Sequence, residues 1–159
     1  MSNVVRLNLT RPPDRAAAGM PAGSPYVSYQ RDDLAQFPVE IGLPGGIDLT
    51  VEAGLLTLDS FGQPEPETAP PTALDLHTYP PTLEDGRDLL LAAAARFGLD
   101  ATAIDSWYEE ARAARDGAVR SGWLRATVDY LRLEVRGSHK PPVDDPDSAQ
   151  TAVHYVLTW

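Results

Sequence analysis

The sequence predicts an α+β fold, in which a single antiparallel sheet of about five to seven strands carries two consecutive helices on one face. Three observations support this prediction. Segments that alternate apolar and polar residues lie near both ends of the chain, as expected for half-buried strands. Between them are two segments, about 83–97 and 101–118, whose apolar residues recur at helical spacing. Strands grouped on either side of a helical block are typical of α+β domains.

The strands expected before the helices are short and are separated by turn residues. Residues 3–10 alternate between apolar and polar side chains. The best-supported hairpin joins 38–43 to 47–52 through Pro44-Gly45-Gly46, because proline and glycine favour turns. The remaining candidates are 26–30, 55–58 and 74–76.

Both predicted helices have recognisable ends. Thr82 can cap the first helix together with Asp85, and Gly98 follows its last apolar residue, where a glycine commonly ends a helix. Asp100 or Thr102 can cap the second helix. The apolar stripe of this second helix, which we expect to face the core, consists of Ile104, Trp107, Tyr108, Ala111 and Ala118.

Two further strands are expected at the end of the chain, because residues 127–136 and 152–159 alternate again. We expect one domain over residues 1–159, since the chain is too short for a second full domain. It contains long loops rich in proline, glycine or aspartate, which cover 11–25, 59–71 and 138–149.

The composition excludes several classes of protein. The chain of 159 residues has 13 Lys and Arg against 23 Asp and Glu, a formal net charge of −10. Nucleic-acid binding needs a basic surface, so we expect no nucleic-acid partner. The absence of cysteine excludes disulfides and cysteinyl metal sites. No apolar run approaches the roughly 18 residues that span a membrane. As given, the sequence predicts a cytoplasmic protein, or a secreted or envelope-anchored one if a leader was removed.

The motifs that usually mark catalysis or cofactor binding are incomplete. A calcium loop starting at Asp144 would need Gly at its sixth position and Glu at its twelfth, but these are Ala149 and Tyr155. The glycines around Pro44 lack the Lys-Ser/Thr of a phosphate loop. His139 lies near three aspartates in the sequence, and a solvated loop explains this proximity. We therefore predict no cofactor, no metal and no catalytic residue.

The predicted binding residues are charged or aromatic. Acidic side chains in the two later loops would contact a basic partner. The charged strand face with Arg132 and Arg136, and the terminal Trp159, are alternative docking elements because Arg and Trp are frequent at interfaces. The complete set is Asp59, Glu65, Glu67, Asp144, Asp145, Asp147, Arg132, Arg136 and Trp159.

Three functions from different classes fit these observations. The first is a non-catalytic acidic protein-binding module, such as an immunity or inhibitor protein that neutralises a basic partner. The second is the soluble domain of an envelope-associated or secreted lipoprotein-like protein. The third is a small enzyme that combines carboxylates of the second helix with histidines; it would use Asp105, Glu109, Glu110, His77, His139 and His154.

Overall fold

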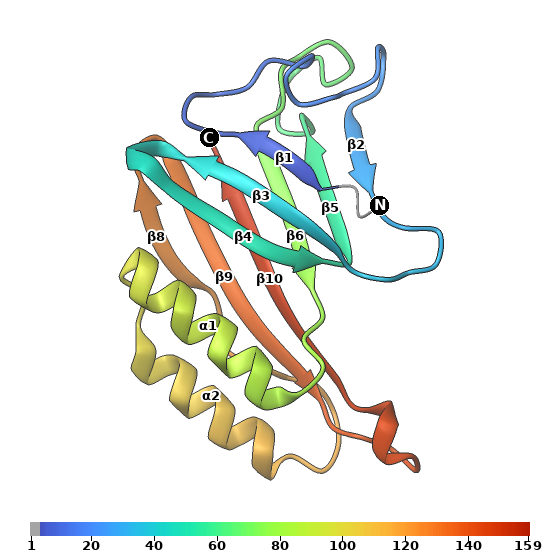
Figure 1. Ribbon diagram of the computed structural model, residues 1–159, viewed down its shortest axis with the longest axis vertical. Helices are drawn as coiled ribbons and strands as arrows, with labels where there is room; N and C mark the ends of the chain where they lie inside the picture. The colour runs from blue at the N-terminus through green and yellow to red at the C-terminus, as the bar shows by residue number, and fades with distance from the viewer. Residues whose placement is uncertain (1–3) are drawn as a thin grey trace. The chain divides into compact units, whose positions relative to one another are not determined.

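Two helices and two β-sheets confirm the predicted α+β class in the computed structural model, which describes residues 4–159 (Figure 1). The helices are α1 (Leu83–Phe97) and α2 (Ala101–Ala113). The strands are β1 (Val5–Asn8), β2 (Tyr26–Tyr29), β3 (Phe37–Leu43), β4 (Ile47–Ala53), β5 (Leu55–Asp59), β6 (Ala73–Thr78), β7 (Val119–Arg120), β8 (Leu124–Val128), β9 (Leu131–Lys140) and β10 (Gln150–Thr158).

The larger sheet has seven strands in the order β2-β5-β6-β10-β9-β7, with β8 also paired to β9. The chain divides into two compact units. Unit 1 comprises Met1–Thr78, Thr127–Leu133 and Val156–Trp159, and unit 2 comprises Tyr79–Ala126 and Glu134–Tyr155. Strands β9 and β10 run through both units.

A second sheet of three strands, β1-β3-β4, lies within unit 1. The predicted hairpin forms, with Val39 opposite Val51 and Ile41 opposite Leu49. β1 then joins β3 in parallel, with Leu7 opposite Ile41, so the structure has two sheets where the sequence predicted one. The predicted first strand is shorter, Val5–Asn8, and its expected first residue, Asn3, lies outside the described residues.

The part of the larger sheet in unit 1 is built on β5, which pairs antiparallel with β2 on one side and β6 on the other. In β5 and β6, leucines alternate with residues that face the other side of the sheet, and the face that carries these leucines is completely buried. The fully buried side chains on that face include Leu56, Leu58, Leu74 and Leu76. The other face remains half-exposed, as Thr57 and Asp59 show.

In unit 2, both helices pack on β9. A Cβ atom at Gly137 would lie 2.7 Å from Leu90 Cδ1 of α1 and 3.0 Å from the ring of Trp107 of α2. Both caps form as predicted. The Thr82 hydroxyl accepts a hydrogen bond from the Asp85 N–H, and the Asp100 carboxylate accepts bonds from the first turn of α2.

The second helix differs from the prediction in two ways. It ends at Ala113 rather than near 118, because Ala114 has an extended backbone and Gly117 turns the chain with a φ of 69°. Trp107 is buried as expected, but Tyr108 is half-exposed. The Tyr108 ring lies beneath the guanidinium of Arg87, at 4.8 Å, so it packs against a cation on the helix surface.

The predicted strand 127–136 is two strands, β8 and β9. The chain turns between them at Asp129, whose φ of 56° is a left-handed conformation that aspartate tolerates better than most residues. β9 then continues to Lys140, so His139 belongs to this strand and not to the loop in which we expected it.

Within residues 4–159, neither helix is long and apolar enough to cross a membrane.

Candidate functional site

The loop after β5 is closed at its base and filled by its own groups. The Thr72 N–H donates a hydrogen bond to the Asp59 carbonyl at 2.8 Å, which brings the two ends of the loop together. Ser60 is fully buried; its hydroxyl donates to the Pro66 carbonyl, and its N–H donates to the Pro25 carbonyl. Closed loops of this kind are compact surface elements that often carry function.

Arg15 joins this loop to the long loop that follows β1. Its guanidinium donates hydrogen bonds to the carbonyls of Pro66 and Ala69 in the later loop, at 3.3 and 2.9 Å. It also donates to the carbonyls of Pro21 and Ser24 in its own loop, at 2.7 Å each. The two segments are therefore held by one shared cation, although their composition predicted only that each is a long loop.

Two exposed aromatic rings accompany this closed loop. Phe61 is 61% exposed and Tyr26 is 47% exposed, and their ring centroids are 6.0 Å apart. The Asp59 carboxylate accepts a hydrogen bond from the Phe61 N–H, and burial raises the pKa of this carboxyl. Glu65 and Glu67 are exposed and form no ion pair within residues 4–159. We use the name acidic aromatic loop for Phe61, Glu65 and Glu67 of the loop together with the adjoining Asp59 of β5 and Tyr26 of β2.

The other predicted acidic loop is less constrained. Asp144, Asp145 and Asp147 are all exposed, and the Asp145 carboxylate caps a short 3₁₀ turn (Pro146–Ser148) by accepting from the Asp147 N–H. His139 is buried, and its Nδ1 lies 2.9 Å from the Thr151 hydroxyl. In the described part of the chain these groups form no metal-ligand cluster.

The structure brings two of the remaining predicted residues together. Arg132 and Trp159 line a shallow hollow of about 350 Å³ in unit 1, beside Tyr130. Arg136 instead lies in unit 2, where its guanidinium is 4.4 Å from the centroid of the Trp123 ring. The alternative docking residues thus belong to two different places in the fold.

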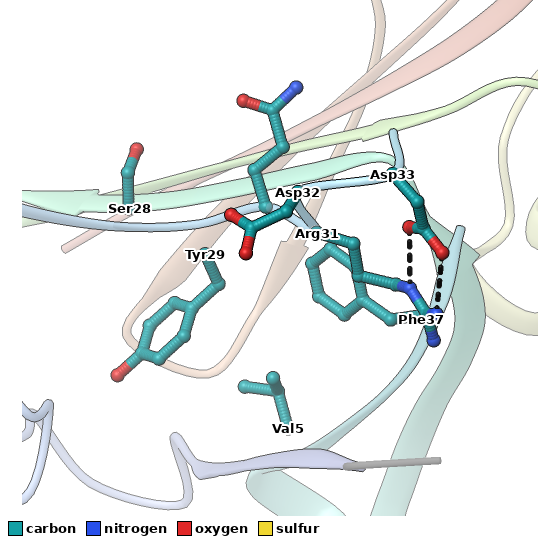
Figure 2. Close-up of a pocket in the computed structure, with 8 residues that line it drawn as sticks. Val5, Ser28, Tyr29, Arg31, Asp32, Asp33 and Phe37 are labelled. Atoms are coloured by element: carbon teal, nitrogen blue, oxygen red, sulfur yellow. Dashed lines mark hydrogen bonds and ion pairs between the residues drawn. The ribbon is translucent and has the colours of Figure 1, made fainter. Parts of the chain in front are cut away.

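A larger hollow of about 600 Å³ lies beside β2, and sequence reasoning did not find it (Figure 2). Its lining comes from β1, β2, β3 and the segment between β2 and β3, and consists of Val5, Ser28, Tyr29, Gln30, Arg31, Asp32, Asp33 and Phe37. Four chain segments meet here, so no single local pattern could have revealed the hollow.

The charges around this hollow are unequal. Arg31 donates two hydrogen bonds to the Asp33 carboxylate, at 2.9 and 2.7 Å, and this pairing lowers the pKa of Asp33 to about 2. Figure 2 shows the Asp32 carboxylate turned away from that pair, toward Tyr29. Within residues 4–159, Asp32 has no ion-pair partner. The uncompensated charge of the lining is therefore negative.

Two of the three carboxylates considered for an enzyme form ion pairs on the helix surface. Asp105 accepts from Arg87 at 2.7 Å, and Glu109 lies 3.8 Å from Arg112. These ion pairs are exposed at both ends and follow ordinary helix-surface chemistry.

Comparison with known proteins finds no matching family model, no matching curated protein and no matching solved structure.

Proposed function

We propose that this protein is a non-catalytic binding module that takes a basic protein partner on its acidic aromatic loop, as an immunity or inhibitor protein does. The observation that carries the proposal is the exposed pair of rings formed by Tyr26 of β2 and Phe61, which lies on the loop held by Arg15 and Ser60. Exposed aromatic residues on a fixed scaffold are the anchors that dominate many protein interfaces.

The fixed geometry of the loop supports binding because it reduces the cost of association. A mobile loop loses conformational freedom when a partner binds, and that loss weakens the complex. Here the Asp59–Thr72 closure and the Arg15 bonds have already ordered the chain. Contacts that Phe61 makes with a partner therefore add to the affinity without the cost of ordering the loop.

The charge of unit 1 supports a basic partner. Its segments contain eleven acidic and five basic side chains. Three of the five basic side chains already bind groups of the same unit: Arg6 pairs with Glu40, Arg31 pairs with Asp33, and Arg15 binds loop carbonyls. The excess of acidic over basic side chains would steer a positively charged partner toward this unit.

The experiment is affinity capture from lysate of the source organism with the immobilised full chain at about 0.05 M and 0.5 M salt, because screening lengths shorten over this range. We expect capture of a basic protein at low salt and weaker capture at high salt. Phe61→Ser and the double variant Glu65→Gln/Glu67→Gln should each lose it.

The matched control is Glu52→Gln/Glu110→Gln, which removes the same charge from exposed positions outside the loop. We expect this control to capture the partner as the unmodified chain does. If nothing is retained at low salt, or if the loop variants and the control behave alike, the proposed function is wrong.

A further inference from the structure

β2 is an edge strand, so no strand covers its outer side in the part of the chain that the structure describes. It pairs with β5 on one side, with Val27 opposite Leu58 and Tyr29 opposite Leu56. Within residues 4–159, no strand pairs with its other side, and it ends the strand order of the larger sheet. The register with β5 directs the N–H and C=O groups of Tyr26 and Ser28 away from the sheet. The Ser24 hydroxyl bonds both groups of Tyr26, so an added chain would pair with Ser28 and would displace this hydroxyl from Tyr26.

The sequence of this strand does nothing to prevent such pairing. Natural edge strands are usually protected against pairing with another chain by a charged residue, often lysine, or by a proline within the strand. β2 is Tyr-Val-Ser-Tyr, which contains none of these. By comparison, β1, which ends the smaller sheet, carries Arg6 in its interior.

The hollow of Figure 2 lies at the end of this edge, since Ser28 and Tyr29 of β2 are part of its lining. Val5 and Tyr29 are half-buried and contribute apolar carbon to a lining that is otherwise mostly polar or charged. A side chain that projected into the hollow from an added strand would meet this apolar carbon and the Asp32 carboxylate, the one carboxylate of the lining without an ion-pair partner within residues 4–159. Its volume is within the range of about 300–1,000 Å³ that is usual for ligand pockets.

We propose that an extended segment of the basic partner adds to the outer edge of β2 and places a Lys or Arg side chain in this hollow. The aliphatic stem packs against Val5 and Tyr29, and the cationic end pairs with Asp32. Long basic side chains suit such a site because the stem is apolar and the end is charged. This inference rests on the proposed function in one respect, the basic character of the partner.

The test measures binding of short synthetic peptides to the full chain by isothermal titration calorimetry and by backbone amide shifts. The first peptide is acetyl-Thr-Val-Lys-Val-Thr-amide, and the second replaces Lys by the uncharged isostere norleucine. A third carries N-methyl groups that block strand pairing, and N-acetyl-lysine amide tests the side chain alone. We expect the Lys peptide to bind and to shift the amides of residues 26–33.

The norleucine peptide should bind about fivefold or more weakly, because it loses the charged contact. The N-methylated peptide and the free lysine derivative should show little binding. If the free derivative binds as well as the Lys peptide, the hollow is a site for small amines and strand addition is wrong. If no probe binds, the whole inference is wrong.

Variants of the protein separate this inference from the proposed function. Asp32→Asn should weaken the Lys peptide about fivefold and leave the norleucine peptide unchanged, whereas the matched control Asp116→Asn should change neither. Phe61→Ser should leave peptide binding intact, because Phe61 does not line the hollow. Partner capture that requires Phe61 but is indifferent to Asp32→Asn would overturn the inference and leave the proposed function standing.

Discussion

The guanidinium of Arg15 donates a hydrogen bond to the Ala69 carbonyl at 2.9 Å, across 54 positions of the sequence. The same group bonds the Pro21 and Ser24 carbonyls of its own loop. Two proline-rich segments without regular secondary structure thus become one ordered surface. The exposed Phe61 and the carboxylates near it owe their fixed position to this contact.

Replacement of Arg15 should loosen both loops and destabilise the protein. Arg15→Ala removes one donor from four loop carbonyls, of which Pro66 keeps the Ser60 hydroxyl and Pro21 keeps the Ser24 N–H. Hydrogen bonds to charged groups contribute about 1.5–3 kcal/mol each where they are well formed. We expect the free energy of unfolding in urea to fall by about 2 kcal/mol. Limited proteolysis should cut within residues 59–71 faster than in the unmodified chain.

The control for this prediction is Arg11→Ala, an exposed arginine of the same loop. It should change the free energy of unfolding by less than about 0.5 kcal/mol. Equal effects of the two variants would show that Arg15 does not organise the loops.

The close contact of both helices with β9 depends on Gly137. A Cβ atom at this position would lie 2.7 Å from Leu90 and 3.0 Å from Trp107, closer than packed carbon atoms tolerate. Gly137→Ala should therefore lower the free energy of unfolding by about 1–3 kcal/mol, the usual cost of overpacking.

Gly42→Ala in β3 provides the comparison. A Cβ atom at Gly42 would lie 3.8 Å from the Asp48 carboxylate and 3.9 Å from the Leu7 carbonyl, which are ordinary contact distances. Urea unfolding should show it to be nearly neutral. If Gly137→Ala is also neutral, the helices do not approach β9 as closely as described.

The buried histidine should make stability depend on pH. Burial lowers the pKa of His139 below its usual value of 6.5, so the folded state binds this proton less readily than the unfolded state. The contribution of a neutral His139 to stability is therefore present above pH 6.5 and is lost as the pH falls through the lowered pKa.

Urea unfolding of the unmodified chain and of His139→Gln, at intervals from pH 7.5 to 5, measures this effect. The unmodified chain should lose more stability over this interval than the variant does. Parallel pH profiles would contradict the burial of His139.

The sequence predicted the first helix well because its limits are local. Thr82 caps the helix through a contact three residues away, and Gly98 ends it with a left-handed φ of 70°. The second helix was overestimated because Ala118 continues the apolar spacing, whereas Gly117 already turns the chain. Periodicity indicates which face is apolar, but it does not show where the hydrogen bonding stops.

The arrangement of strands was predicted less completely. The alternation in 3–10 and 38–43 identifies the buried face of each strand, but not the strand with which it pairs. The parallel contact of Leu7 with Ile41, which creates the second sheet, joins segments separated by a long connection. For this reason the order of the elements predicted one sheet where the structure has two.

The site was predicted in part. Glu65 and Glu67 were singled out from charge alone, and their exposure agrees with that expectation. Arg15, Phe61 and Asp32 were missed because their significance depends on contacts with distant backbone or on exposure. An arginine in a proline-rich loop gives no signal in the sequence that it will bind carbonyls fifty positions away.

The most direct test of the central claim is amide hydrogen exchange on the complex with the captured partner. The account predicts slower exchange in residues 59–71 and around Tyr26 when the partner is bound, with α1 and α2 unchanged. Protection confined to the helices, with residues 59–71 exchanging as in the free protein, would contradict it.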